Sequence, residues 1–124
     1  MLTIGSTLLI LTPPKCIKEH LYIIIAVENK SGKALLVNVI THKKGCDKSC
    51  ILRLGQHSFL NYLSIINYAD AQIVEVSVLE YLLKEKLIKS HEPFTPIQLK
   101  RIQKCGLNSP AIPGKCRDFL SANI

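Results

Sequence analysis

The chain has 124 residues, of which 48% are apolar and 20% charged, and its net charge is +7 with histidine neutral. This length fits one domain, and the apolar content excludes a disordered tail. Residues 1–60 carry eight basic and three acidic side chains, whereas residues 61–124 carry eight and six. A small basic domain with its excess charge in one half favours a polyanionic partner, RNA or DNA before a membrane. The alternative is a lysine-rich surface that is merely solvated.

The first 76 residues are expected to form β-strands. The apolar start at residues 1–11 is too short to span a bilayer and lacks the basic leader of a signal peptide, so residues 8–11, which two prolines follow, are expected to form a first strand. Residues 20–27 and 34–41 are rich in β-branched side chains, and the loop between them has the Asn, Ser and Gly of a hairpin. Three further short strands follow, at residues 50–54, 64–67 and 71–76. Five or six short strands predict a small antiparallel barrel or a strongly curved sheet.

Helical periodicity replaces the strand pattern at Ser77. Ser77 and Glu80 have the spacing of a capping box, and the apolar positions that follow predict a helix to about Lys86. We therefore expect one α+β domain over residues 1–124, with a barrel at 1–76 and a helical C-terminal extension at 77–124.

A second capping box opens the second of two expected C-terminal helices. Thr95 and Gln98 have the spacing of the box, and Pro96 takes the first helical position. Residues 105–106, Cys-Gly, are expected to end this helix. Residues 114–120 are expected to form one last helical turn.

The cysteines do not predict a disulfide framework or a metal centre. An odd number cannot pair within one chain, and a domain of this length needs no disulfide. Five candidate ligands lie within sixteen residues, but without the spacing of a zinc motif, so no metal and no cofactor are predicted. Reduced thiols favour a cytoplasmic protein. The cysteines are Cys16, Cys46, Cys50, Cys105 and Cys116, and the five candidate ligands are His42, Cys46, Asp47, Cys50 and His57.

The stretch that best predicts chemistry is residues 41–57, where basic and imidazole side chains are dense. Cleavage of RNA without a metal needs a base for the 2′-hydroxyl, an acid for the leaving oxygen and cations for the phosphate. His42 and His57 are the candidate acid and base, because imidazole titrates near pH ~6.5. The candidate phosphate contacts are Lys43, Lys44, Lys48 and Arg53.

Each of these residues also has a structural interpretation. His57 follows a Gly-Gln turn, and its structural alternative is a hydrogen bond to that turn. Lysines in a polar loop are more often solvated than functional, and Thr41, at a strand end, has a capping role as its alternative. Cys46 and Cys50 are interpreted as structural thiols, since nothing in the sequence activates a thiolate.

Four segments carry a resemblance to a known family. They are Ile-Gly-Ser-Thr-Leu at residues 4–8, the apolar strand at 20–27, Asn-Val-Ile-Thr at 38–41 and Ser-Ile-Ile-Asn-Tyr-Ala-Asp at 64–70. Over roughly residues 4–87 the chain resembles the PemK/MazF-like toxin superfamily, whose members are SH3-like barrels that cleave mRNA. The resemblance implies an SH3-like barrel, an antitoxin partner, a homodimer and catalytic roles for Thr41 and Asp70. The catalytic arginine of the family falls on Asn67, so that group is missing here.

These observations together predict a toxin-like RNA-binding protein that acts as a metal-independent endoribonuclease, leaves 2′,3′-cyclic phosphate ends and loses cleavage, but not its fold, in His57→Ala. One alternative is a barrel that binds nucleic acid without cleaving it, which the missing arginine favours. The other is a protein-interaction module whose C-terminal helices supply the interface. Phosphate contacts weaken steeply with salt, so ionic strength separates the nucleic-acid binders from the interaction module.

Overall fold

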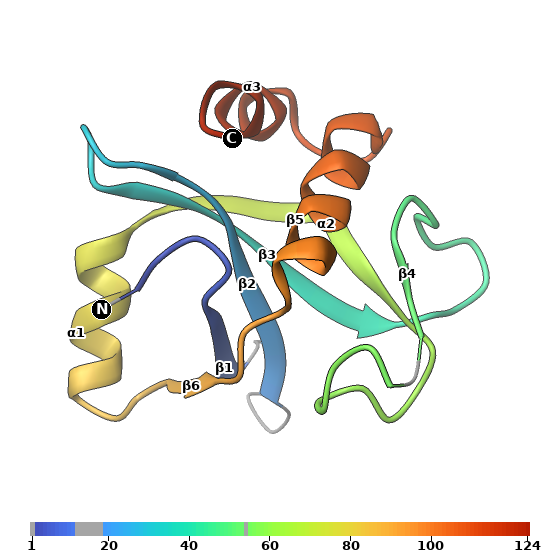
Figure 1. Cartoon of the computed structure of the whole chain (residues 1–124), viewed down its shortest axis with the longest axis horizontal. Coiled ribbons are helices and arrows are strands. Elements are labelled where there is room, and N and C mark those ends of the chain that lie inside the picture. Colours follow the sequence, from blue (N-terminus) through green and yellow to red (C-terminus); the bar gives the residue numbers. More distant parts are fainter. Residues whose placement is uncertain (1, 12–18, 54) are drawn as a thin grey trace.

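The strands of the N-terminal half assemble into one antiparallel sheet. The computed structural model describes residues 2–11, 19–53 and 55–124. The strands are β1 (Thr7–Leu11), β2 (Glu19–Glu28), β3 (Lys33–Thr41), β4 (Ile51–Leu52), β5 (Ser64–Glu75) and β6 (Lys89–His91); the helices are α1 (Val76–Lys84), α2 (Pro96–Asn108) and α3 (Gly114–Ala122). The sheet order is β4-β5-β3-β2-β1-β6, and the sheet curls into a half-barrel (Figure 1). The α+β class and the small antiparallel barrel-like sheet are therefore confirmed.

The predicted hairpin is the centre of this sheet. β2 and β3 pair from Tyr22↔Asn38 to Glu28↔Lys33, with one register shift near Ala26. β5 then pairs with β3 along its whole length, from Lys33↔Glu75 to Thr41↔Ser64. The sequence predicts two short strands, at residues 64–67 and 71–76, where β5 runs unbroken. A second register shift, between Leu36 and Asn38 of β3, lets β5 continue to pair with β3 through this stretch.

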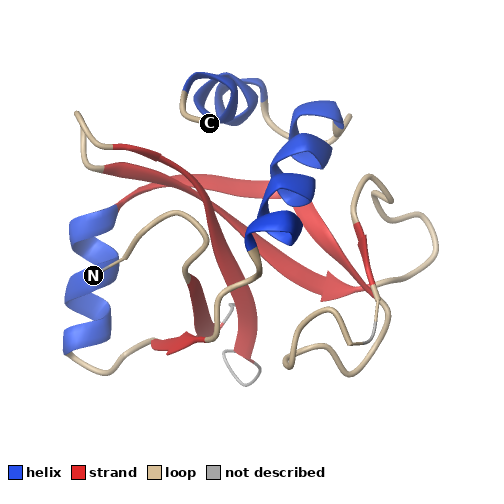
Figure 2. Cartoon of the chain, in the orientation of Figure 1, coloured by secondary structure: helices blue, strands red, loops and turns tan. Residues whose placement is uncertain are grey.

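Both faces of β2 are buried, as its nearly continuous apolar sequence predicts. Ile23 and Ile25 belong to one core cluster, whereas Ile24 belongs to another on the opposite face. α2 and α3 supply Ile102 and Leu120 to the first cluster, and α1 lies against the second (Figure 2). The sheet is thus covered by helices on two sides, and its open end near the β3 terminus is left to loops.

Gly106 lets α2 approach the sheet and α3 closely. A Cβ atom at this position would lie 2.9 Å from Leu120 Cδ2 and 3.0 Å from Tyr68 Cε1. Tyr68 cannot easily retreat, because its hydroxyl donates a 2.6 Å hydrogen bond to the Ile102 carbonyl. The expected helix end at residues 105–106 is therefore wrong: this glycine permits packing in mid-helix, and α2 continues to Asn108.

The helix starts follow two different rules. α2 begins as predicted, since the Thr95 hydroxyl accepts from the Gln98 amide and the Gln98 side chain accepts from the Thr95 amide. The capping box at Ser77 is wrong. α1 has Glu75 as its N-cap, with no side-chain hydrogen bond, because β5 leads directly into the helix and Ser77 is already inside its first turn.

Two further differences concern the C-terminal half. The residues between α1 and α2 return to the sheet as β6, which pairs with β1 from Thr7↔His91 to Leu9↔Lys89. The last helical turn is a full helix, α3, of nine residues. Within the described residues, no helix combines the length and the apolar character needed to cross a membrane.

Candidate functional site

A cleft of about 310 Å³ opens at the end of the half-barrel where β3 terminates. Thr41, the last residue of β3, lies in it opposite Ser64, its partner on β5. The start of β2, the end of β6 and the loop after His57 complete the walls. The lining residues are Glu19, His20, Val39, Ile40, Thr41, Ser58, Phe59, Leu60, Asn61, Tyr62, Ser64 and His91. The cleft therefore collects hydroxyl, imidazole and aromatic groups from distant parts of the sequence.

His57 lies just before the loop residues that line the cleft, and it is 7% exposed. The amide of Phe59 donates to its Nδ1 at 3.1 Å, so the proton is on Nε2, which donates to the Glu92 carbonyl at 2.7 Å. The ring stacks on Phe94, with centroids 4.5 Å apart. Both ring nitrogens are thus hydrogen-bonded to the backbone, and the imidazole joins its own loop to the segment after β6.

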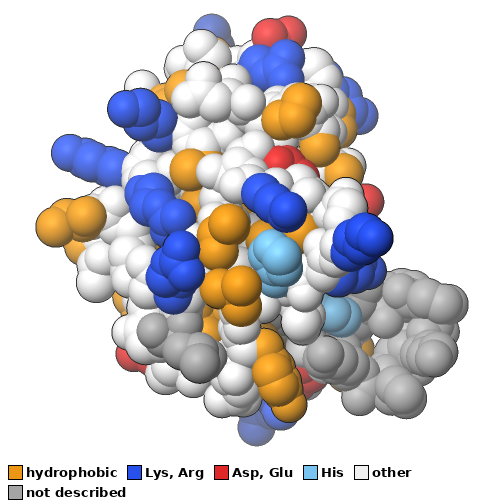
Figure 3. All heavy atoms as spheres, turned by 90° about the vertical axis from the view of Figure 1, so that its right-hand side faces the viewer, with side chains coloured by type: hydrophobic (Ala, Val, Ile, Leu, Met, Phe, Trp, Pro, Cys, Tyr) orange, Lys and Arg blue, Asp and Glu red, His pale blue; other side chains and the backbone are white. Residues whose placement is uncertain are grey.

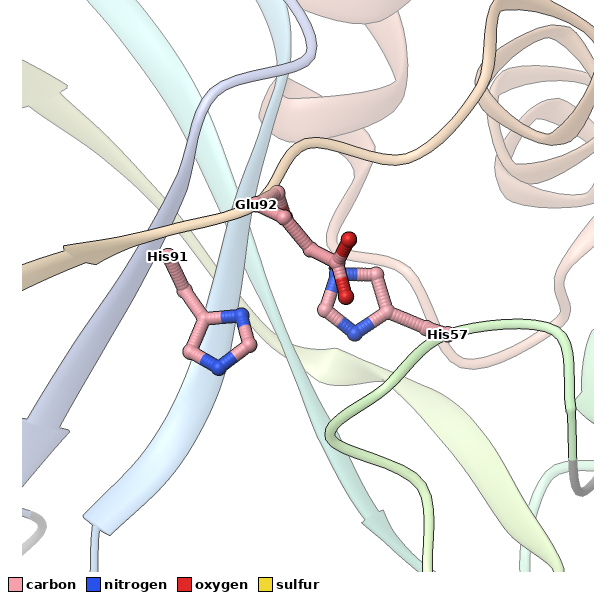
Figure 4. A group of neighbouring side chains, drawn as sticks. All are labelled: His57, His91 and Glu92. Carbon is pink, nitrogen blue, oxygen red and sulfur yellow. The ribbon is translucent and has the colours of Figure 1, made fainter.

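His91 and Glu92 lie beside His57 (Figure 4). One potential ligand atom of each of the three side chains lies within 4.8 Å of the other two. A hydrogen bond from the Ser58 hydroxyl lowers the pKa of the exposed Glu92 carboxyl, and the neighbouring imidazoles lower it further. His91 Nδ1 is buried and has no hydrogen-bond partner among the described residues.

The predicted cations lie in the loops around β4, next to the cleft. Lys43, Lys44, Lys48 and Arg53 are all exposed. Arg101 of α2 joins them, because its guanidinium donates to the Ile51 carbonyl at 2.6 Å. We call these five residues the basic loop surface. Figure 3 looks onto this side and shows lysine and arginine side chains among hydrophobic and histidine side chains.

Asp47 is the one carboxylate of residues 42–63, and it is used internally. It accepts hydrogen bonds from the amide and hydroxyl of Ser49 and from the hydroxyl of Ser109 at 2.6 Å. Burial alone would raise the pKa of Asp47, but the hydrogen bonds from Ser109 and Ser49 outweigh it and lower the pKa. Asp47 therefore fastens its loop to the end of α2 and leaves the cations of the loop with little competition.

The other predicted site residues are not gathered at the cleft. His42 is partly exposed at the start of its loop, where its amide donates to the Leu63 carbonyl at 2.8 Å. Asp70 lies six residues along β5 from Ser64, or about 20 Å at the rise of a β-strand. There it accepts a hydrogen bond from Asn67 at 2.8 Å. The structure thus joins Thr41 to the cleft and the cations to its border, but it separates Asp70 from both.

The thiols are consistent with a structural role. Cys50 is fully buried, and burial followed by the adjacent Cys105 thiol raises its pKa to about 12. Cys116 is also buried, with its thiol directed to the Ala71 carbonyl. Cys16 lies outside the described residues. A thiol with such a raised pKa is not an activated nucleophile.

Sequence reasoning missed His20, His91 and Glu92. His20 stands at the start of a predicted strand and residues 91–92 at the break between two predicted helices, and neither belongs to a spaced motif. The only signal was the identity of the residues: three of the four histidines now lie at or behind the cleft. No family model, curated protein or solved structure matches this chain.

Proposed function

We propose that this protein binds RNA, with the phosphates on the basic loop surface and a nucleotide in the adjacent cleft. The observation that carries this proposal is the exposure of five cations around β4, where the one carboxylate of the loops is already hydrogen-bonded to Ser49 and Ser109. Exposed lysine and arginine attract the phosphate backbone whatever its sequence, and they release its counterions on binding.

The cleft adds the groups that distinguish single-stranded RNA from a general polyanion. Its volume of about 310 Å³ is at the small end of ligand sites, which suits one nucleotide. Phe59 and Tyr62 offer aromatic surface on which an unpaired base can stack, and Tyr62 is 68% exposed. The hydroxyls of Thr41 and Ser64 and the amide of Asn61 offer hydrogen bonds to a base edge or to the 2′-hydroxyl.

The resemblance to PemK/MazF-like toxins supports RNA as the polyanion, because Thr41 lies in the cleft and the sheet is barrel-like. Cleavage needs more than this arrangement. The two nitrogens of His57 are engaged, Asp70 is distant and the family arginine is replaced by Asn67. We therefore propose binding as the function, and the assay below reports cleavage at the same time.

The test compares two double variants that remove the same charge from different places. Lys43→Ala/Lys44→Ala alters the basic loop surface, whereas Lys30→Ala/Lys33→Ala alters exposed lysines at the hairpin turn on the opposite end of the sheet. Binding of a fluorescein-labelled, mixed-sequence RNA strand is measured by anisotropy from low to moderate salt in EDTA, and the products are examined on a gel. We expect the first variant to reduce the slope of log K against log salt by about 1.4, since each single-strand phosphate contact contributes about 0.7.

Three outcomes separate the alternatives. The proposal holds if the loop variant weakens binding and lowers the salt slope while the hairpin variant matches the unmodified protein. Equal effects of the two variants would mean that only net charge matters, and the proposed surface would be wrong. Absence of RNA binding at low salt would also contradict the proposal and would leave a protein-interaction module as the remaining alternative.

A further inference from the structure

We propose that His57, His91 and Glu92 bind a first-row divalent metal ion such as zinc at the wall of the cleft. One ligand atom of each side chain lies within 4.8 Å of the other two. Figure 4 shows the three side chains converging from the loop that carries His57 and from the end of β6. Two imidazoles and one carboxylate are a common ligand set for zinc and iron, and three protein ligands leave a coordination position for water or a substrate.

His91 supplies the observation that points most directly to a ligand. Its Nδ1 atom is buried and has no hydrogen-bond partner among the described residues. Buried polar atoms in native proteins are nearly always paired, so this nitrogen requires an explanation. Neutral imidazole offers a lone pair to a metal ion, and a metal at Nδ1 would give this atom the partner that the described residues do not.

His57 is already held in a suitable tautomer. Its Nε2 donates to the Glu92 carbonyl at 2.7 Å, and a metal-binding histidine usually donates its other N–H to a carbonyl or carboxylate in this way. The lone pair is therefore on Nδ1, where the Phe59 amide now donates at 3.1 Å. A metal ion would displace the Phe59 amide from this lone pair and leave that N–H without its acceptor, a loss that the affinity of a three-ligand site exceeds.

Glu92 brings the negative charge that a divalent ion requires. The side chain is exposed, and an exposed glutamate carboxyl is ionised at neutral pH. In a tetrahedral zinc site the bonds are about 2.0–2.1 Å, which places ligand atoms roughly 3.4 Å apart. The three atoms lie within 4.8 Å of one another, and the exposed Glu92 side chain is free to adjust toward this spacing.

Cobalt is a suitable probe because its absorption spectrum reports both geometry and ligand type. We expect the 124-residue protein, reduced and freed of bound metal with EDTA that is then removed, to bind one equivalent of Co²⁺ with tetrahedral d–d bands that Zn²⁺ abolishes. The thiolate-to-cobalt charge-transfer band in the near ultraviolet should be absent, since no cysteine belongs to the site. His91→Ala should weaken binding by at least about 100-fold, because even changes behind the ligands cost about 10- to 100-fold.

A matched pair of carboxylate variants keeps the test independent of folding. Glu92→Gln and Glu80→Gln each neutralise one exposed side chain, and Glu80 lies on α1, outside the cluster. We expect the first to lose most of the cobalt affinity and the second to retain it, with circular dichroism confirming that both fold. Equal affinity in the two variants, a thiolate band, or no cobalt binding at millimolar concentration would each overturn the proposal. None of these readouts depends on RNA binding.

Discussion

Replacing His57 by alanine should destabilise the fold, whereas the sequence alone predicts a folded protein without activity. The imidazole is 7% exposed, stacks on Phe94 and accepts the Phe59 amide. Losing that acceptor leaves a partly buried N–H unpaired, which costs about 1–3 kcal/mol. The Glu92 carbonyl loses less, because it also accepts the Thr7 hydroxyl at 2.7 Å. With the lost burial of the ring, we expect a decrease of about 2–4 kcal/mol in the free energy of unfolding.

Urea unfolding followed by circular dichroism in EDTA measures this loss without any contribution from a metal ion. The control is His42→Ala, because His42 is partly exposed and should change stability by no more than about 0.5 kcal/mol. A decrease of less than about 1 kcal/mol for His57→Ala would refute the assigned hydrogen bonds. The measurement must precede any functional study of His57, since a domain with marginal stability would lose RNA binding through unfolding alone.

Two further predictions concern packing and acid stability. Gly106→Ala gains about 1 kcal/mol of helix propensity, but the new Cβ would lie 2.9 Å from Leu120 and 3.0 Å from Tyr68, which costs about 1–3 kcal/mol. We therefore expect the thermal midpoint of unfolding to fall by roughly 5 °C. A higher midpoint would contradict this packing. The lowered pKa of Asp47 means that its contribution, about 1 kcal/mol at most, is present above its ordinary value of 3.8 and disappears as the pH falls through the lowered pKa. The stability difference between the unmodified protein and Asp47→Asn should therefore be constant well above pH 3.8 and shrink as the pH falls below it, as urea midpoints measured across this range will show.

The fold was predictable where the side-chain pattern itself specifies burial. Ile23, Ile24 and Ile25 alternate between two cores, and only a strand covered on both faces accommodates such a run. The Thr95 capping box is equally local, since its hydrogen bonds join residues three apart. β6 was not predictable in this way. Its three residues have no apolar period, and they form a strand because the edge of β1 provides hydrogen-bonding partners.

The same distinction applies to the candidate site: features set by residues close in sequence were predictable, whereas features set by tertiary contacts were not. The basic loop surface was predictable because four of its five cations lie within eleven consecutive residues, and lysines in polar loops remain exposed. The choice of His42 and His57 as an acid–base pair assumed that imidazoles close in sequence share a site. The structure instead engages both nitrogens of His57 with backbone groups, one of them 35 residues away.

The positions of His91 and Glu92 depend on contacts among three chain segments that are distant in sequence. The Glu92 carbonyl accepts hydrogen bonds from Thr7 and from His57, so β1, the loop after β4 and the end of β6 are joined at one atom. These hydrogen bonds place His91 at the cleft, with one ring nitrogen that has no partner among the described residues, and they set Glu92 beside two imidazoles. No spacing within residues 89–93 encodes that arrangement, because its partners lie up to 85 residues away. If the cobalt titration succeeds, the His-Glu pair after β6 would be a ligand pair that only the strand pairing of β1 with β6 reveals.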